Sequence, residues 1–301
     1  MVGGVRVDPV VDVAECGVRS PEVALGAGER LRGGNRIHKG SDLPFRGGCR
    51  IGPESAHDRI GPNLAAVTST GPLVLGHRGS PRVARENTVE AFAAALAEGA
   101  DGVELDTHAT ADGVLVCHHD PIVPEVGLIP ELTEAQLAAA VPWLPRLDAV
   151  LDTCVGTLVN VEIKNSPGDA GYDPSQRTAD LVVDLLRARG SDRVIVSSFE
   201  LAAIDRVRER DASIPTGYLY APDMANDDAF FAATVGGHGA LHPHWVSVAG
   251  DEGADFVARC HASKLTVNVW TVNDEVVAAP LAAAGVDALI TDIPATLRTW
   301  L

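Results

Sequence analysis

The chain has 301 residues, 46% of them hydrophobic, and a formal net charge of -17 at pH 7. This length accommodates one large domain or two small ones, and the apolar content is sufficient for a core. The acidic balance argues against nucleic acid as a partner and against adhesion to an anionic membrane surface, because both need basic patches. A phosphate-bearing substrate would therefore need positive charge supplied locally, by a metal ion or by a few Lys and Arg side chains.

The cysteines and the apolar runs bear on the compartment. Five cysteines are scattered without a C-x-x-C pair, which is typical of reduced thiols rather than of a disulfide framework or a zinc site. No apolar run approaches the roughly 20 residues of a membrane span, so we expect no stable membrane insertion. Asp8, Pro9 and Asp12 interrupt the apolar start of the chain, unlike the pattern of a signal peptide. We therefore expect a cytoplasmic protein, and its oligomeric state stays open.

The first part of the chain differs in character from the rest. Gly, Arg, Pro and Ser dominate from Gly17 to Gly61, and no apolar period of a helix or strand persists there. Such a sequence buries too little apolar surface to offset its ordering entropy. We predict a disordered N-terminal extension over residues 1–68 and a folded domain over residues 69–301. A regulatory tail, a partner-binding arm or a simple non-folding extension would all have this composition.

The folded part opens with a strand and a helix. The apolar run Leu73–Leu75 predicts the strand, and His77 and Arg78 follow it closely. Asn87 is the predicted N-cap of the helix, with Glu90 three residues on to complete a capping box. Polar residues thus stand at the end of the first strand.

A second strand, Val103–Thr107, carries two acids. Glu104 and Asp106 are two residues apart, so their side chains point to the same face of the strand. Burying two carboxylates among apolar residues is costly unless positive charge lies between them, and a divalent cation supplies that charge. A third apolar run, Val114–Cys117, ends in two histidines, of which the second is His119.

Strands and helices alternate from there to the C-terminus. The other predicted strands are Leu158–Ile163, Val194–Val196, Thr216–Leu219, Ala240–His242, Leu265–Trp270 and Ala288–Ile290. The predicted helices are Thr133–Ala140, Leu147–Leu151, Ser175–Arg189, Leu201–Arg210, Asp227–Thr234, Gly253–Ala262, Glu275–Ala284 and Pro294–Trp300. Thr133 and Gln136 indicate a capping box, in a segment over residues 121–144 that is otherwise expected to be loop.

Eight strand–helix repeats of this length predict an α/β fold, a closed parallel (β/α)8 or TIM barrel. An open doubly wound sheet is the alternative, but no Gly-rich dinucleotide fingerprint follows the first strand. In a barrel the active residues lie at the carboxyl ends of the strands. The polar residues that occupy such positions are His77, Arg78, Glu104, Asp106, His119, Glu162, Lys164, Trp270 and Asp292.

The motifs of this region form an ordered series. HRG, ENT, GAD, VELD, a T-x-DG turn and HHD follow one another between Leu73 and Asp120. This series resembles the signature of the glycerophosphodiester phosphodiesterase family. Weaker echoes follow at VEIKN (Val161–Asn165), SSFE, VNVWTVND and GVDALITDIP, so that the resemblance extends from about Pro72 to Leu301.

Three acids are the candidate metal ligands. Glu104, Asp106 and Glu162 offer oxygen ligands of the kind that Mg2+ or Ca2+ prefers, although a lone acid of this kind would more often be salt-bridged. The resemblance implies the same role, because acids at the corresponding positions of the family bind metal. We therefore expect a divalent metal, Mg2+ or Ca2+, as the cofactor.

Two histidines are the candidate acid–base pair. Histidine titrates near neutrality, so that one ring can accept a proton while another donates one. The resemblance assigns these roles to His77 and His119 and leaves open which acts first as the base. His57, His108 and His118 match no catalytic position of the family, and we expect them to be structural and bonded to backbone.

Three further residues are expected to contact the substrate. Arg78 and Lys164 suit phosphate oxygens, and their alternative role is a salt bridge to the acids. Trp270 would form an apolar wall beside the substrate or simply pack in the barrel. Glu86 is expected to support its loop rather than to react.

The resemblance implies metal-dependent hydrolysis of small-molecule glycerophosphodiesters to sn-glycerol 3-phosphate and an alcohol. The segment after Asp120 lacks the polar D-R-T-T-like stretch that many family members carry, so the head-group preference stays open. A lysophospholipase D or sphingomyelinase-D-like phosphodiesterase on the same barrel is one alternative. A catalytically silent phosphate-binding barrel is the second, against which the intact histidines argue.

Overall fold

The structure is a computed structural model, and it describes residues 71–190 and 193–301. The extension predicted over residues 1–68, with Cys16, Cys49 and His57, lies outside the described residues. Within the described part, every predicted strand and helix after Pro72 is present, and its ends lie within two residues of the prediction.

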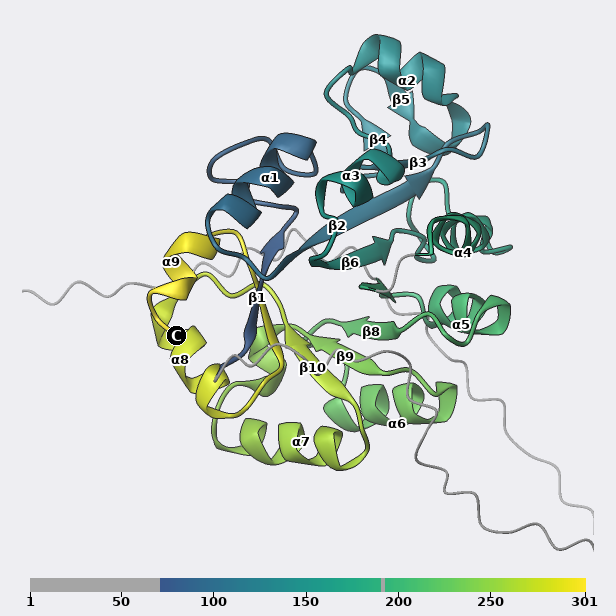
Figure 1. The fold of residues 1–301 in the computed structure, drawn as a ribbon. Coiled ribbons are helices and arrows are strands. Elements are labelled where there is room, and N and C mark those ends of the chain that lie inside the picture. The colour runs from purple at the N-terminus through teal and green to yellow at the C-terminus, as the bar shows by residue number, and fades with distance from the viewer. Residues whose placement is uncertain (1–70, 191–192) are drawn as a thin grey trace, which may run out of the picture.

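Eight parallel strands close into a barrel (Figure 1). They are β1 (Leu73–His77), β2 (Gly102–Ala109), β6 (Leu158–Ile163), β7 (Val194–Ser198), β8 (Thr216–Tyr220), β9 (Ala240–Pro243), β10 (Thr266–Val269) and β11 (Ala288–Thr291). Closure follows from β1, which pairs in parallel with both β2 and β11. The predicted barrel is therefore confirmed, and the open sheet is excluded.

Helices surround the strands on the outside (Figure 1). They are α1 (Val89–Ala97), α3 (Leu147–Thr153), α4 (Arg177–Arg189), α5 (Leu201–Arg210), α6 (Asn226–Gly236), α7 (Asp251–Ala262), α8 (Glu275–Ala283) and α9 (Pro294–Arg298). Their apolar faces pack against the outward side chains of the strands in two large clusters. None of the helices in the described part is both long and apolar enough to cross a membrane.

A small extra unit follows β2. The strand β3 (Leu115–Cys117) pairs antiparallel with β2, and beyond it lie β4 (Ile122–Val123), β5 (Gly127–Leu128), the 3-10 helix η2 (Ile129–Glu131) and α2 (Glu134–Ala140). Val123, Ile129 and Leu137 give this unit its own apolar cluster. The capping box of Thr133 and Gln136 is confirmed. The two-stranded sheet was not predicted, because two-residue strands have no readable period.

The interior of the barrel explains where the polar residues point. An apolar cluster that includes Leu75, Leu158 and Ile290 fills its centre. Side chains two residues apart on a strand share a face. His77 therefore follows Leu75 on the inner face of β1, and Asn160 and Glu162 follow Leu158 on the inner face of β6.

The start of α1 differs from the prediction. Thr88, not Asn87, is the N-cap, and its side chain accepts a hydrogen bond from the backbone N–H of Ala91. Asn87 instead has a φ of 55° and forms two hydrogen bonds to Asp106 across the barrel mouth. The side chain of Asn87 therefore forms a tertiary contact with Asp106 instead of capping the helix, as the sequence pattern had predicted.

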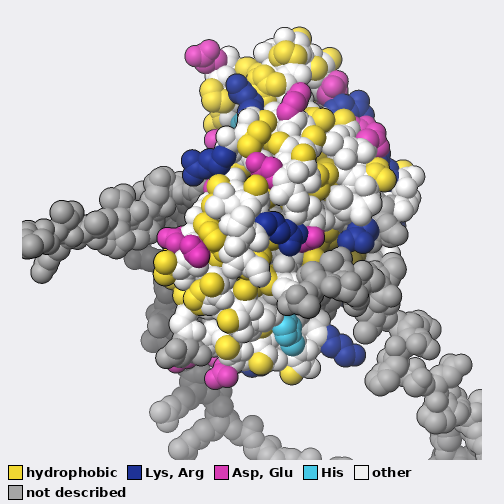
Figure 2. All heavy atoms as spheres, turned by 60° about the vertical axis from the view of Figure 1, so that its left-hand side comes forward, with side chains coloured by type: hydrophobic (Ala, Val, Ile, Leu, Met, Phe, Trp, Pro, Cys, Tyr) yellow, Lys and Arg dark blue, Asp and Glu magenta, His cyan; other side chains and the backbone are white. Residues whose placement is uncertain are grey.

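The surface in Figure 2 carries acidic and basic side chains interspersed with apolar ones. No continuous basic stripe crosses this face of the described residues, in keeping with the acidic net charge. The cysteines of the described part, Cys117, Cys154 and Cys260, are free and buried.

Candidate active site

Three acids meet inside the barrel mouth. The parallel register of β2 and β6 sets Asp106 beside Glu162 and Glu104 beside Asn160. The acids are only 3%, 1% and 6% exposed for Glu104, Asp106 and Glu162. One oxygen of each lies within 4.8 Å of the others. The predicted metal ligands are therefore brought together.

Two cations accompany the acids. Arg78 Nε lies 3.2 Å from Asp106 Oδ2. Lys164 Nζ lies 3.1 Å from Glu162 Oε1 and 3.6 Å from Asp106 Oδ1. The salt bridges that the sequence offered as the alternative role of Arg78 and Lys164 are thus present, and both side chains also line the central pocket.

The environment pushes the pKa values of two neighbouring acids apart. Burial and the charge of Asp106 raise the pKa of Glu104 to about 8. Burial also opposes ionisation of Asp106, but Lys164 and Arg78 outweigh it and hold the pKa of Asp106 well below its ordinary value. Arg78 and Lys164 form their ion pairs with Asp106 and Glu162. The positive charge near Glu104 is therefore too small to favour its ionised form.

A divalent cation fits this arrangement. The Oε1 atom of Glu104 is buried and has no hydrogen-bond partner, and such an atom is costly unless it is satisfied. The donor set consists of carboxylate oxygens alone, which suits Mg2+ or Ca2+ rather than a thiolate-seeking metal. The residues present thus match the predicted metal.

His77 stands at the end of β1 with a fixed orientation. Its Nδ1–H donates to Asp292 Oδ1 at 2.7 Å, and Asp292 in turn accepts from Asn273 Nδ2 at 2.6 Å. Burial lowers the pKa of His77, but the hydrogen bond to Asp292 and the charge of Glu104 more than compensate, so the pKa lies above its ordinary value. With Nδ1 occupied, Nε2 is the atom available to the pocket.

His119 approaches from the segment after β3. Its Nδ1 forms a 2.8 Å hydrogen bond to Asp120 Oδ1. Two neighbouring histidines bond to backbone: the buried His108 bonds to the backbone oxygen of His119, and His118 bonds to that of Asp120 while its ring lies near Trp143. Burial lowers the pKa of His108 to about 4, so this ring is neutral.

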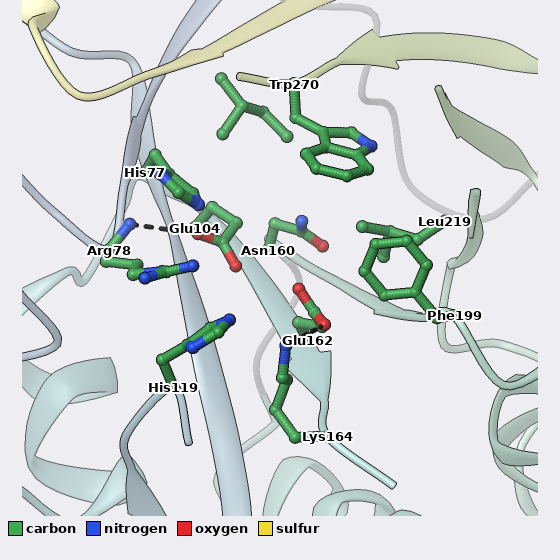
Figure 3. Close-up of a pocket in the computed structure, with 11 residues that line it drawn as sticks. His77, Arg78, Glu104, His119, Asn160, Glu162, Lys164, Phe199, Leu219 and Trp270 are labelled. Atoms are coloured by element: carbon green, nitrogen blue, oxygen red, sulfur yellow. Dashed lines mark hydrogen bonds and ion pairs between the residues drawn. The ribbon is translucent and has the colours of Figure 1, made fainter. Parts of the chain in front are cut away.

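Arg78 lies between the two histidines (Figure 3). Its backbone N–H donates to Glu104 Oε2 at 3.1 Å, and its φ of 54° turns the chain sharply after β1. One guanidinium nitrogen lies 3.3 Å from Glu86, which supports the loop as predicted. In Figure 3 the rings of His77 and His119 point toward Glu104 from either side of the arginine.

The opposite side of the pocket is apolar (Figure 3). Trp270 packs edge-on against Phe199, with ring centroids 5.4 Å apart, and its indole N–H donates to the backbone oxygen of His242. Leu219 lies beside Phe199, and both line the pocket. The predicted wall at Trp270 is present, and it includes two residues that the sequence did not single out.

Asn160 was also missed. It lines the pocket, is fully buried, and has no hydrogen-bond partner for either amide atom. Its place two residues before Glu162 on a strand was a readable signal, because that spacing puts both on one face. Asp292 was placed after the last strand, but its bond to His77 joins residues 215 positions apart and has no local signature.

Comparisons with known proteins agree with this geometry. The sequence profile of the glycerophosphoryl diester phosphodiesterase family matches residues 77–296. The chain belongs to this family. A glycerophosphodiester phosphodiesterase of Caldanaerobacter subterraneus is 30% identical over 243 residues, which cover 75% of this chain and 96% of the relative. The resemblance seen in the motifs is confirmed, and with it the class of phosphoric diester hydrolases.

Solved structures of glycerophosphodiester phosphodiesterases share the fold. The enzyme of Thermotoga maritima superposes with a TM-score of 0.67 at 24% identity, over 76% of this chain and 98% of the other. A phosphodiesterase of Oleispira antarctica, solved in complex with the product sn-glycerol-3-phosphate, gives a TM-score of 0.66 at 25% identity over 76% and 96% of the two chains.

Proposed function

We propose that this protein hydrolyses small-molecule glycerophosphodiesters to sn-glycerol 3-phosphate and an alcohol, with a divalent metal ion. The observation that carries the proposal is the pocket lined by two cations, two histidines and the acids Glu104 and Glu162, with the third buried acid, Asp106, within 4.8 Å of these two. The family membership supports it. So does the product, sn-glycerol-3-phosphate, held by the Oleispira antarctica neighbour. The site residues lie between His77 and Asp292, and the functional unit of this proposal is the domain predicted over residues 69–301.

Glu104, Asp106 and Glu162 would hold the ion, either Mg2+ or Ca2+. When bound, it supplies positive charge that neutralises the phosphoryl oxygens as they gain charge. Arg78 and Lys164 would bind the remaining phosphate oxygens, Arg78 through a planar fork and Lys164 as a point charge. Their present ion pairs with the acids hold them at the place where the phosphate would enter.

His77 and His119 would move the protons. The attacking oxygen bonds to phosphorus and gives its proton to one imidazole, while the other imidazole gives a proton to the departing alkoxide. Asp292 and Asp120 each occupy Nδ1 of one ring, which leaves Nε2 for the reaction. The two rings stand on either side of Arg78, where a bound phosphate would separate them (Figure 3).

The test measures release of sn-glycerol 3-phosphate from a panel of glycerophosphodiesters, after chelation and after return of Mg2+ or Ca2+. We expect turnover only with metal, and on water-soluble esters. Turnover of lysophospholipids alone would replace the proposal by the lysophospholipase D alternative. Absence of turnover on every ester with either metal would contradict it. The cytoplasmic location stays a prediction that this assay does not address.

A further inference from the structure

A second, larger cavity adjoins the reaction pocket. The pocket over the acids has a volume of about 40 Å3, whereas the neighbouring cavity has about 550 Å3. The two share Phe199 and Leu219, which lie on the side of the pocket opposite His77 and His119 (Figure 3). The second cavity, here called the side cavity, is formed by the segments that follow β6, β7 and β8.

The side cavity combines apolar walls with acidic groups. Phe199, Leu219 and Met224 belong to its apolar lining, and the charged residues that line it within the described chain are Glu200, Asp223 and Asp228. Every charged group of this lining is therefore negative. The reaction pocket next to it contains Arg78 and Lys164.

Two of these acids, Asp223 and Asp228, are exposed to solvent. Within the described residues neither Asp223 nor Asp228 forms an ion pair, whereas the adjacent Asp227 pairs with Arg259. Glu200 uses one carboxylate oxygen to accept from the backbone N–H of Ala202 at the start of α5. The cavity thus offers negative charge beside an apolar surface without a cation of its own.

We propose that the side cavity binds the leaving alcohol of the substrate and selects alcohols that carry an ammonium group. This inference rests on the proposed function, because the phosphate must be held by Arg78 and Lys164. The glycerol is small and uncharged; its hydroxyl groups can donate to carboxylates but carry no positive charge to match them. A trimethylammonium or ammonium group matches both features, since it is cationic and also packs on aromatic and apolar surfaces.

An acyl chain fits the side cavity less well. It would match the apolar walls, but it would also remove water from carboxylates to which it offers no hydrogen bond or charge, which is unfavourable. Charge complementarity therefore favours a cationic head group over a lipid tail.

The first test compares kcat/KM for glycerophosphocholine with that for the uncharged glycerol ester. We expect the wild type to prefer the choline ester, and Asp223→Asn combined with Asp228→Asn to reduce that preference about three- to tenfold, as two partly screened charges would. Asp255→Asn removes one exposed acid from α7 and is the control, with an unchanged preference. An unchanged preference in the double variant would overturn the proposal.

The second test does not depend on turnover. Calorimetry would compare binding of choline with binding of its uncharged isostere, in which carbon replaces the nitrogen. Tighter binding of choline, weakened by the double variant and by added salt, supports the subsite even if the protein hydrolyses no ester. Equal binding of the two alcohols, or tighter binding of a lysophospholipid that the double variant does not change, would contradict it. If the protein hydrolyses no ester but still binds choline more tightly than the isostere, the result contradicts the proposed function and leaves the choline subsite supported.

Discussion

The two sides of the barrel mouth have different compositions. β1, β2, β6 and the segment after β3 bring together every acid, cation and histidine assigned to the reaction. The strands β7, β8 and β10 end in an apolar wall of Phe199, Leu219 and Trp270. In the proposed function the charged side binds the phosphate, and the apolar side binds the part of the substrate that varies. The difference teaches that the residues for catalysis and the residues for substrate selection can lie on separate strands of one barrel.

On the charged side, two neighbouring acids have pKa values that are shifted in opposite directions. The pKa of Glu104 is raised to about 8 and that of Asp106 is lowered, although both lie on β2. Such a separation of neighbouring pKa values is common at functional sites. Among the described residues, Phe199, Leu219 and Trp270 on the apolar side include no such pair of acids, so a change there should alter selectivity and leave the chemistry intact.

The largest effect is expected on the charged side. Glu104→Ala, or chelation of the wild type, should lower kcat by about 10³-fold or more, because the metal supplies several kcal/mol of charge stabilisation. The variant should unfold at a temperature close to that of the wild type, since the change removes a carboxyl group whose ionised form is disfavoured by burial and by Asp106. Thermal unfolding provides this control. Full turnover by Glu104→Ala would contradict the metal assignment.

The next effect separates the two histidines. His77→Ala and His119→Ala should each lower kcat by roughly 10²–10⁴-fold, the usual range for general acid–base groups. An ester with p-nitrophenolate as its leaving group needs little protonation, so the variant without the general acid should recover more activity on it. His118→Ala is the matched control and should be mild, since that ring contacts Trp143 and backbone. Equal losses for both variants on both esters would contradict separate acid and base roles.

Local patterns predicted most of the fold. The strand Leu158–Ile163 and the helix Leu201–Arg210 have the boundaries that their apolar periods indicated. The eight repeats favoured a closed barrel, and the lack of a Gly-rich dinucleotide fingerprint after the first strand argued against the open doubly wound sheet. Thr133 and Gln136 show that a capping signal is readable when no tertiary contact competes for the side chain.

What the sequence missed depends on distant partners. Asn87 was assigned to the helix start, but its amide binds Asp106 instead. The roles of Asp292 and Asn160 follow from the closed barrel, which sets one beside His77 and the other beside Glu104. The acids and histidines were readable from the sequence because the motifs that carry them are local.

A smaller effect is expected from the partner of His77. Asp292→Asn should lower kcat by about 10–100-fold, the range for groups that orient a reacting side chain. Asp292 raises the pKa of His77, so its replacement lowers that pKa. The limb of the pH–rate profile that His77 controls should move to lower pH. A uniform loss of rate with an unchanged profile would show a structural role only.

The smallest effect concerns stability on the apolar side. His242 on β9 is buried, and burial lowers its pKa to about 3 from 6.5. Below pH 6.5 the unfolded chain takes up a proton that the folded chain does not. Stability from this residue is therefore complete above 6.5 and falls as the pH drops toward 3. At about pH 5 the loss should be about 2 kcal/mol.

Denaturant unfolding at neutral pH and at about pH 5 checks this expectation. His242→Gln retains a polar group for Asn268, with which His242 forms a hydrogen bond. It should lose about 2 kcal/mol less than the wild type between the two pH values. The exposed His261→Gln is the control. The same pH dependence in the wild type and His242→Gln would show that His242 becomes protonated in the folded chain.

The division between the two sides is tested most directly by one kinetic comparison. It measures kcat/KM for the choline and glycerol esters in the wild type, in Glu162→Gln and in the variant that combines Asp223→Asn with Asp228→Asn. Glu162→Gln should lower both values by the same factor, while the double variant should change their ratio and leave the glycerol ester unaffected. A changed ratio in Glu162→Gln, or an equal loss on both esters in the double variant, would contradict the account.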